Sequence, residues 1–329
     1  MIYKNEDFKN FGFLKIEISK EIKDNLVNEI LKLKKEKEAI ILAHYYVRDE
    51  IQKIADIVGD SLQLSIEASK TNAKIILFAG VNFMAETAKI LSPAKKVLLP
   101  DLNAGCSLAD SCPTEDFKKF LEKHPNHTVI SYVNTTAEIK ALSDIIVTSS
   151  NAVKIVNSLS KDEKIIFGPD KNLGDYVNSK TGKNMILWNG ACHVHKRFDL
   201  NAILNLKKLF PTAKIIAHPE CEKPIILIAD FIGSTAALLK FTKTDNSDTF
   251  IVVTESGILF KMKELCPDKT FITAPPTDEN CSCNDCSYMK LNTLEKIYLC
   301  LKYELPEIQL DINLIKVAKK SLDRMLELS

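Results

Sequence analysis

Residues 143–149 read SDIIVTS, and the same pattern occurs in two other segments of this 329-residue chain. These segments are ADIVGDS at 55–61 and ADFIGST at 229–235. Each copy begins with a small residue and an aspartate, continues through mostly apolar positions and ends with a hydroxyl residue. Self-similarity at a regular separation is typical of repeated structural units. The chain is therefore predicted to contain three related parts.

A polar residue precedes each copy at a constant distance. It lies 17 positions before the closing hydroxyl, in the pairs His44 and Ser61, Tyr132 and Ser149, and His218 and Thr235. Another apolar run ends 36 positions after each of these polar residues, at Gly80, Gly168 and Thr254. A general alternation of strands and helices would explain the spacing of the apolar runs. It would not explain polar residues at equivalent ends of three runs, and these indicate a site to which all three parts contribute.

The apolar runs themselves predict an α/β fold. Ten of them are short, β-branched and free of alternation, which is typical of parallel strands buried on both faces: AIILAHYY, KIILFAG, KVLLPD, TVISYVN, DIIVTSS, KIIFGPD, MILWNG, KIIAHPE, TFIVVTES and TFITAPP. Helical patterns such as IKALSD and NAVKIVNSL lie between them. We predict three αβα units related by a pseudo-threefold axis, each with a small parallel sheet, around a central active site.

The predicted domains are an N-terminal helical arm, three αβα repeats and C-terminal helices, at residues 1–38, 39–118, 119–205, 206–290 and 291–329. Apolar residues at helical spacing mark a helix at each end of the chain. They are Ile22, Leu26, Ile30 and Leu33 near the start, and Leu314, Ala318, Leu322 and Met325 near the end.

Composition excludes several classes of partner. The 44 basic residues are nearly balanced by 43 acidic ones, and no basic tract is interleaved with aromatics, so we expect no nucleic-acid partner. The N-terminus lacks the apolar core of a signal peptide. The most apolar stretch, PIILIADFIG, is interrupted by Asp230 and is shorter than the ~20 residues that a spanning helix needs. We therefore expect a cytoplasmic protein with no membrane association.

Nine cysteines in a reducing compartment indicate metal binding or catalysis rather than a disulfide framework. Cys106 lies 62 positions after His44, and Cys192 lies 60 positions after Tyr132. The third repeat ends in NCSCNDCSYMK at 280–290, and its cysteines lie 63, 65 and 68 positions after His218: Cys281, Cys283 and Cys286. One cysteine from each repeat would complete a site, although spacing does not choose among the last three. Other cysteines are expected to be small apolar residues, namely Cys221, Cys266 and Cys300.

Three thiolates at a threefold axis suit two kinds of metal site. One is a zinc ion with three sulfur ligands and an open position. The other is a 4Fe-4S cluster with three cysteine ligands, which leaves one iron open to bind substrate as a Lewis acid. A structural zinc clasp within 281–286 alone is disfavoured, because such clasps usually have four local ligands.

Polar residues at the predicted strand ends suit a small, anion-rich substrate. They are His44, Tyr46, Ser61, Tyr132, Asn134, Ser149, His195, His218, Glu220 and Thr235. An isolated histidine is more often structural, but His44 and His218 occupy the same place in two repeats. Three of the hydroxyl residues lie where helices begin, so helix capping is the alternative interpretation for Ser61, Ser149 and Thr235. Helix N-termini also bind phosphate and carboxylate groups, so the two interpretations are compatible.

Ten motifs in order resemble the quinolinate synthase family over nearly the whole chain: LAHYY, GDSL, NAGCSLAD, YVNTTAEIKALSD, TSSNA, GPDKNLG, WNGACHVH, HPEC, FIGST and DRMLEL. The resemblance implies a pseudo-threefold trio of αβα domains around a three-cysteine 4Fe-4S cluster. It also implies the condensation of iminoaspartate with dihydroxyacetone phosphate to quinolinate, with release of phosphate and water, for NAD biosynthesis. An aspartate-oxidising enzyme would supply the iminoaspartate.

The same resemblance implies Cys106, Cys192 and Cys286 as the cluster ligands. This chain departs from the family in its last loop, where CxCxxC followed by Ser287 replaces a frequent CxxCxxC followed by proline. The departure leaves the roles of Cys281 and Cys283 open. Substrate contacts carry over to His44, Ser61, Tyr132, Asn134, Ser149, His218, Glu220 and Thr235, with Tyr46 as a second catalytic tyrosine.

We expect the open iron to polarise a substrate oxygen and to assist dehydration. Glu220, Tyr46 and His218 are the candidate catalytic residues, and together they would shuttle protons during tautomerisation and ring closure. Two other functions fit parts of the pattern. One is a 4Fe-4S hydro-lyase acting on another small acid, and the other is a non-catalytic iron–sulfur or zinc regulatory module.

Overall fold

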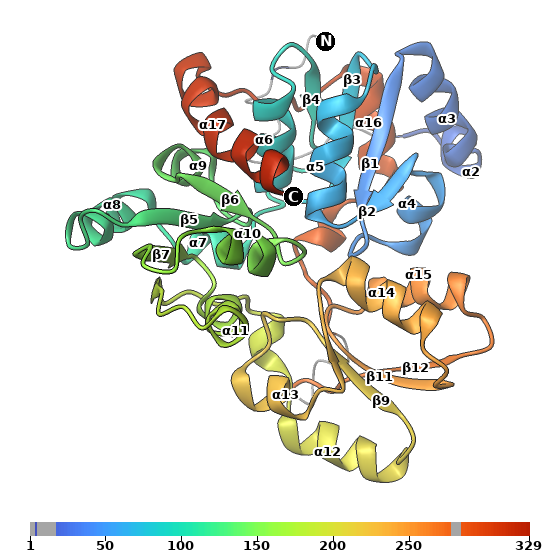
Figure 1. Ribbon diagram of the computed structural model, residues 1–329. Helices are drawn as coiled ribbons and strands as arrows, with labels where there is room; N and C mark the ends of the chain where they lie inside the picture. Colours follow the sequence, from blue (N-terminus) through green and yellow to red (C-terminus); the bar gives the residue numbers. More distant parts are fainter. Residues whose placement is uncertain (1–3, 5–17, 278–283) are drawn as a thin grey trace. The chain divides into compact units, whose positions relative to one another are not determined.

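Three four-stranded parallel sheets form the framework of the protein (Figure 1). The computed structural model describes residues 4, 18–277 and 284–329. The strand order is the same in each sheet: β2-β1-β3-β4, β6-β5-β7-β8 and β10-β9-β11-β12. Each predicted repeat contains one sheet, so the predicted α/β fold class is confirmed.

The first sheet consists of β1 (Ala39–His44), β2 (Ile57–Gly59), β3 (Ile75–Ala79) and β4 (Lys96–Leu98). Helices connect successive strands, and they are α4 (Asp49–Ile54), α5 (Ser61–Lys70) and α6 (Asn82–Leu91). Every residue of β3 is buried, as expected for a strand with helices on both faces of its sheet. Two helices from the ends of the chain also pack together and against this sheet, α3 (Leu26–Glu36) and α16 (Leu294–Tyr303).

The second sheet consists of β5 (Thr128–Tyr132), β6 (Ile145–Val147), β7 (Ile165–Gly168) and β8 (Ile186–Leu187). Its connecting helices are α9 (Ala137–Leu142), α10 (Ala152–Ser158) and α11 (Lys171–Thr181). Two helices precede it, α7 (Ser107–Asp110) and α8 (Thr114–Glu122).

The third sheet consists of β9 (Lys214–Ala217), β10 (Phe231–Ile232), β11 (Thr249–Val253) and β12 (Thr270–Thr273). In Figure 1 it lies between two pairs of helices, α12 (Leu200–Leu209) with α13 (Lys223–Ile228), and α14 (Thr235–Thr244) with α15 (Ile258–Leu265). Cys221 belongs to the apolar core on one side of this sheet, and Cys300 is fully buried in α16. Both agree with the small apolar role predicted for them, whereas Cys266 is only partly buried.

The aspartate of the repeated segment has one structural role in all three copies. Its carboxylate accepts a hydrogen bond from a backbone N–H of the first strand of its own sheet: Asp56 from Ile41 at 2.8 Å, Asp144 from Val129 at 2.8 Å, and Asp230 from Ile215 at 2.7 Å. The backbone N–H of each aspartate donates in return to the carbonyl of the same partner. The repeated segment is therefore a short second strand that this aspartate attaches to the first strand.

The predicted terminal helices are present, with one difference at the N-terminal end. The predicted first helix is divided at Asn25 into α2 (Lys20–Asp24) and α3, because the N–H of Asn25 turns back to Ile22. At the other end the predicted helix is α17 (Ile312–Leu328), and Ala318, Leu322 and Met325 are fully buried. The described residues also contain two single turns of 3-10 helix, η1 (His195–Arg197) and η2 (Met289–Leu291).

The chain forms two compact units. The first comprises Met1–Cys106, Thr136–Ala141 and Ser287–Asp323, and the second comprises Ser107–Thr135, Leu142–Cys286 and Arg324–Ser329. The first sheet lies in the first unit, and the other two sheets lie in the second. The repeat boundaries given above stay a prediction. Among the helices of the described residues, none combines the length and the apolar character needed to cross a membrane.

Candidate active site

Glu220 lies at the centre of a buried cluster of polar side chains in the second unit. It follows β9 and is 3% exposed. The Tyr132 hydroxyl donates to its Oε1 at 2.6 Å, and Nδ1 of His195 lies 3.1 Å from its Oε2. Tyr132 is the last residue of β5, and His195 begins η1. The carboxyl ends of strands from two sheets therefore meet at one carboxylate, as expected for a site in an α/β protein.

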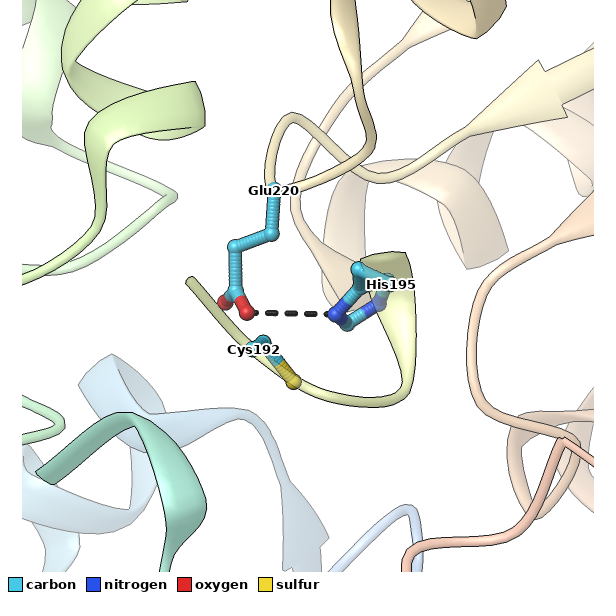
Figure 2. Close-up of side chains that lie close together, drawn as sticks. All are labelled: Cys192, His195 and Glu220. Carbon is cyan, nitrogen blue, oxygen red and sulfur yellow. Dashed lines mark hydrogen bonds and ion pairs between the residues drawn. The ribbon is translucent and has the colours of Figure 1, made fainter. Parts of the chain in front are cut away.

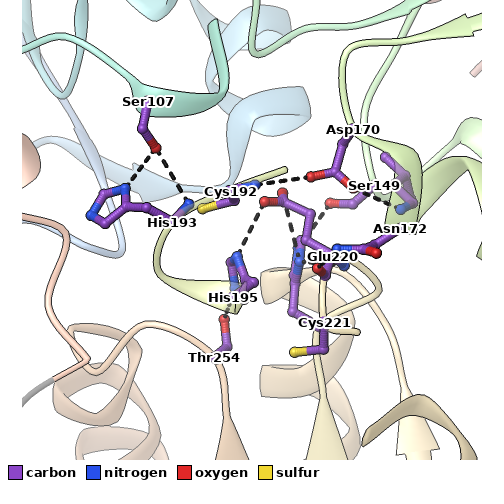
Figure 3. Close-up of polar contacts among 12 residues, drawn as sticks. Ser107, Ser149, Asp170, Asn172, Cys192, His193, His195, Glu220, Cys221 and Thr254 are labelled. Carbon is purple, nitrogen blue, oxygen red and sulfur yellow. Dashed lines mark hydrogen bonds and ion pairs between the residues drawn. The ribbon is translucent and has the colours of Figure 1, made fainter. Parts of the chain in front are cut away.

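His195 is fixed in orientation by contacts on both ring nitrogens. Its Nε2 lies 3.0 Å from Oγ1 of Thr254, and Nδ1 faces Glu220 (Figure 3). Its ring also stacks on that of His218, with 4.7 Å between centroids and 22° between planes. Hydrogen bonds on both sides of an imidazole determine its rotamer and its available proton positions.

His44 and His218 share a local hydrogen bond that defines their tautomer. Nδ1 of His44 accepts from the backbone N–H of Tyr46 at 3.2 Å, and Nδ1 of His218 accepts from that of Glu220 at 3.3 Å. An accepting Nδ1 is unprotonated, so Nε2 carries the ring proton of each neutral imidazole. In His218 this nitrogen lies 3.3 Å from Oγ of Ser149. The predicted equivalence of the two histidines therefore extends to their hydrogen bonding.

The two carboxyl groups of the cluster differ in their ionisation. Burial alone would raise the pKa of Glu220, but His195, His218 and the Tyr132 hydroxyl outweigh it and lower that pKa to about 2. Burial, together with the negative charge of Glu220, raises the pKa of Asp170 well above its usual range. Glu220 is therefore ionised at neutral pH, whereas the Asp170 carboxyl keeps its proton to a higher pH than usual.

Helix capping does not explain the three repeated hydroxyl residues. Asp60 caps α5 and Ser234 caps α14, each through its own side chain, so Ser61 and Thr235 are the first residues inside these helices. Ser149 precedes Asn151, the N-cap of α10, and contacts His218 instead. The capping interpretation is wrong for all three residues, and their hydroxyls lie where a helix N-terminus can bind an anion.

Asn134 has a buried oxygen that lacks a protein partner. Its Oδ1 is inaccessible to solvent and accepts no hydrogen bond from the described residues. A buried polar atom without a partner is costly and is often satisfied by a ligand or by water. Asn134 lies two residues after Tyr132, at the same end of β5. Its role in substrate binding stays a prediction, which the unsatisfied oxygen supports.

The described cysteines fall into two groups. Cys112, Cys221 and Cys300 are buried, and burial raises the pKa of each thiol, to about 12 in Cys112. Partly exposed thiols make up the other group, which contains Cys106, Cys192, Cys266 and Cys286. The three predicted ligands, Cys106, Cys192 and Cys286, all belong to the partly exposed group. Cys281 and Cys283 lie outside the described residues.

One group of potential metal ligands comes together in the second unit. Sγ of Cys192 and ligand atoms of His195 and Glu220 lie within 4.8 Å of one another (Figure 2). The imidazole and the carboxylate are already bonded to each other and to Thr254 and Tyr132. A metal bound by all three would have to break this network, whereas a metal bound by Cys192 alone would leave it intact.

Most of the predicted site residues are placed together, within their own units. In the second unit hydrogen bonds link Tyr132, Ser149, His195, His218 and Glu220. In the first unit the rings of His44 and Tyr46 are in edge contact, 4.4 Å between centroids. Ser61 begins α5 in the first unit, and Thr235 begins α14 in the second. Three residues of the site were not predicted, namely Asp170, Asn172 and Thr254, although the first two lie in the GPDKNLG motif and Thr254 ends an equivalent strand.

Comparison with known proteins assigns the family. Residues 28–327 match the family model described as quinolinate synthetase A protein. A quinolinate synthase from Thermosynechococcus vestitus is 58% identical over 305 residues, covering 93% of this chain and 96% of that protein. One from Cyanophora paradoxa is 54% identical over 329 residues, covering 99% and 98% of the two chains. With nearly its whole length matched, the chain belongs to the quinolinate synthetase A protein family of enzymes.

Proposed function

We propose that this enzyme condenses iminoaspartate with dihydroxyacetone phosphate to quinolinate, releasing phosphate and water, as a step in NAD biosynthesis. The observation that carries the proposal is the buried, ionised Glu220 with a phenol on one oxygen and an imidazole on the other. The condensation needs repeated proton transfers around a small, highly charged molecule, and this cluster supplies a base with two adjacent proton carriers. An aspartate-oxidising enzyme would supply the unstable imine.

Hydrogen-bond donors around the cluster suit the anionic groups of these substrates. The Nε2–H of His44 and of His218 point away from the backbone that fixes their Nδ1 atoms. The hydroxyls of Ser61 and Thr235 lie in the first turns of α5 and α14, where backbone N–H groups also favour phosphate or carboxylate. Donors of this kind can grip phosphate early in the reaction and the dicarboxylate product later.

The donor set also fits an iron–sulfur cluster held by Cys106, Cys192 and Cys286. Thiolates are the usual ligands of such clusters, and these three cysteines are partly exposed while Cys112 and Cys300 are buried. Ser107 directly follows Cys106, and His193 directly follows Cys192. Oγ of Ser107 lies 2.6 Å from Nδ1 of His193, so a hydrogen bond joins the neighbours of two proposed ligands. When bound through three cysteines, a 4Fe-4S cluster supplies an iron that can act as a Lewis acid.

Proton handling falls to the protein side chains. Glu220 is the proposed base, and Tyr132 can pass its hydroxyl proton to the substrate while it takes the proton that Glu220 has accepted, so both side chains return to their starting state. Nδ1 of His195 contacts the other carboxylate oxygen, Oε2, and Nε2 of the same ring contacts Thr254. These contacts keep the carboxylate of Glu220 in its orientation. His218 stacks on His195 and directs Nε2 toward Ser149, which suits substrate binding and proton exchange.

Anaerobic purification followed by iron, sulfide and product analysis tests the proposal. About four irons and about four sulfides per chain are expected for one cluster. The purified protein should form quinolinate from iminoaspartate and dihydroxyacetone phosphate. One zinc per chain and no iron would contradict the cluster. A loaded cluster without quinolinate formation would instead favour a hydro-lyase or a regulatory protein.

Air should inactivate the enzyme. An iron without a protein ligand is open to oxidants as well as to substrate, so exposure to oxygen is expected to remove activity and iron together. Activity and iron content measured on the same sample during aeration provide the check. Activity that outlasts prolonged aeration with an unchanged metal content would indicate zinc.

A further inference from the structure

Two fully buried carboxylates contact the backbone of cysteines that lie far along the chain. Asp170 follows β7 and Glu255 follows β11, so the two occupy similar places in the second and third sheets. Both are 0% exposed. Burying a carboxyl group is costly unless its oxygens accept hydrogen bonds, so the partners of these oxygens matter. Neither residue has a part in the proton transfers proposed for Glu220.

Asp170 joins the start of a helix to a cysteine of the next loop. Its Oδ1 accepts from the N–H of Leu173 at 2.8 Å, which caps α11. Its Oδ2 accepts from the N–H of Cys192 at 3.3 Å, as Figure 3 shows. The backbone strengthens this attachment, because the N–H of Lys171 donates to Gly190 at 2.9 Å.

Glu255 makes the same kind of bridge in the third sheet. Its Oε2 accepts from the N–H of Gly257 at 2.7 Å, and its Oε1 accepts from the N–H of Cys286 at 3.0 Å. The N–H of the neighbouring Ser256 also donates to the carbonyl of Asn284 at 3.4 Å. In both sheets, one carboxylate oxygen holds the local turn and the other holds the amide of a proposed ligand.

The first sheet uses an amide in the corresponding place. Asn82 begins α6, and its Nδ2 donates to the carbonyl of Leu102 at 3.0 Å while its backbone N–H donates to Ala104 at 2.7 Å. These carbonyls belong to the loop that leads to Cys106. The partner in the first sheet is a carbonyl, which needs a donor such as the amide of Asn82. The partners in the other two sheets are N–H groups, which need an acceptor such as the carboxyl oxygens of Asp170 and Glu255.

Helix capping alone does not require these carboxylates. Asn, Ser and Thr cap helices as well as Asp does, and capping uses one oxygen only. Glu255 is not an N-cap at all, since Gly257 occupies that position of α15. The feature that Asp170 and Glu255 share is the second oxygen, which in each case accepts from the N–H of a cysteine.

We propose that Asp170 and Glu255 are positioning residues that hold the backbone of Cys192 and Cys286 so that both thiolates are preset for cluster binding. The inference rests on the cluster of the proposed function. A buried N–H that loses its acceptor carries the full cost of its desolvation. Without this acceptor the cysteine loses a fixed orientation, so the cluster is expected to dissociate faster while the chain stays folded.

Isosteric variants provide the test. Asp170→Asn retains one oxygen for the N–H of Leu173 but presents an NH₂ group to the N–H of Cys192, and Glu255→Gln does the same at Cys286. Asp199→Asn is the matched control, because Asp199 caps α12 by accepting from Ala202 at 3.0 Å and contacts no cysteine. The measurement is the rate of iron loss to a chelator from anaerobically purified protein. Iron loss about tenfold or more faster than in the wild type is expected in Asp170→Asn and Glu255→Gln, the scale of leaving one buried N–H without its acceptor, and not in Asp199→Asn.

Hydrogen exchange and circular dichroism test the same inference independently of iron loss. Hydrogen exchange of the peptide that contains Cys192 should accelerate in Asp170→Asn, and that of the peptide containing Cys286 in Glu255→Gln, each without effect on the other peptide. Circular dichroism reports whether each variant is folded. If only one of Asp170→Asn and Glu255→Gln is folded, the rate of iron loss from that variant decides the outcome. A wild-type protein with a cluster and variants that lose iron at the wild-type rate would overturn this inference alone. A wild-type protein without iron would overturn the proposed function and this inference with it.

Discussion

The variants Cys106→Ala, Cys192→Ala and Cys286→Ala, each purified anaerobically, are expected to lack the visible absorption of the cluster entirely. A cluster with three protein ligands is already one short of the usual four, so it should not survive the loss of another. These three cysteines are partly exposed, in contrast to the buried Cys300. The visible spectrum and the iron content per chain are the measurements.

Two control variants separate ligand loss from other effects. Cys266→Ala should keep the cluster, because Cys266 is partly exposed like the ligands but lies at the end of α15, where its thiol faces the carbonyl of Thr242 at 3.8 Å. Cys281→Ala should keep it as well. If Cys281→Ala is colourless while Cys286→Ala retains the absorption, the third ligand is wrongly assigned. If Cys266→Ala is also colourless, the loss reflects general instability.

The sequence predicted most of the fold because its units are repeated. All ten apolar runs form strands, and the sheets have one order because the runs recur in one order. Two strands were not recognised, β2 and β10, which contain three and two residues. Runs of that length carry no periodicity. The aspartate that precedes both strands was visible in the repeat, but its bond to the first strand could be identified only from the structure.

The site was predicted in outline for a related reason. Equivalent positions at strand ends identified His44, Tyr132 and His218, since the carboxyl ends of parallel strands lie at one edge of a sheet. Which side chains pair is a different question. Tyr132 and Glu220 are 88 positions apart, and their bond depends on side-chain directions that no repeat spacing encodes. Asp170 was missed because an aspartate before a helix predicts a helix cap and nothing more. Only the structure shows that its second oxygen accepts a hydrogen bond from the N–H of Cys192.

Glu220 differs from its counterparts in the other repeats, and this asymmetry indicates chemistry rather than packing. Tyr46 and Asn134 stand at the equivalent places, two residues after His44 and Tyr132. The surface salt bridge that is the alternative role for a glutamate is excluded, because Glu220 is 3% exposed and its partners are a phenol and an imidazole. With its pKa lowered to about 2, the carboxylate is ionised throughout the neutral range.

Glu220→Gln should preserve the surroundings of the carboxylate while removing the base. The amide oxygen can still accept from Tyr132, and the NH₂ group can donate to Nδ1 of His195 if that ring carries its proton on Nε2, toward Thr254. Fold and cluster are therefore expected to be retained, whereas kcat should fall about 100-fold or more, the usual scale of general acid–base catalysis. Glu222→Gln is the matched control, because Glu222 begins α13 without a side-chain cap bond, and it should retain wild-type turnover. Steady-state quinolinate formation, normalised to iron content, is the measurement. Near-normal turnover of Glu220→Gln with an intact cluster would remove Glu220 from the mechanism and leave its buried carboxylate as a structural anchor for His195.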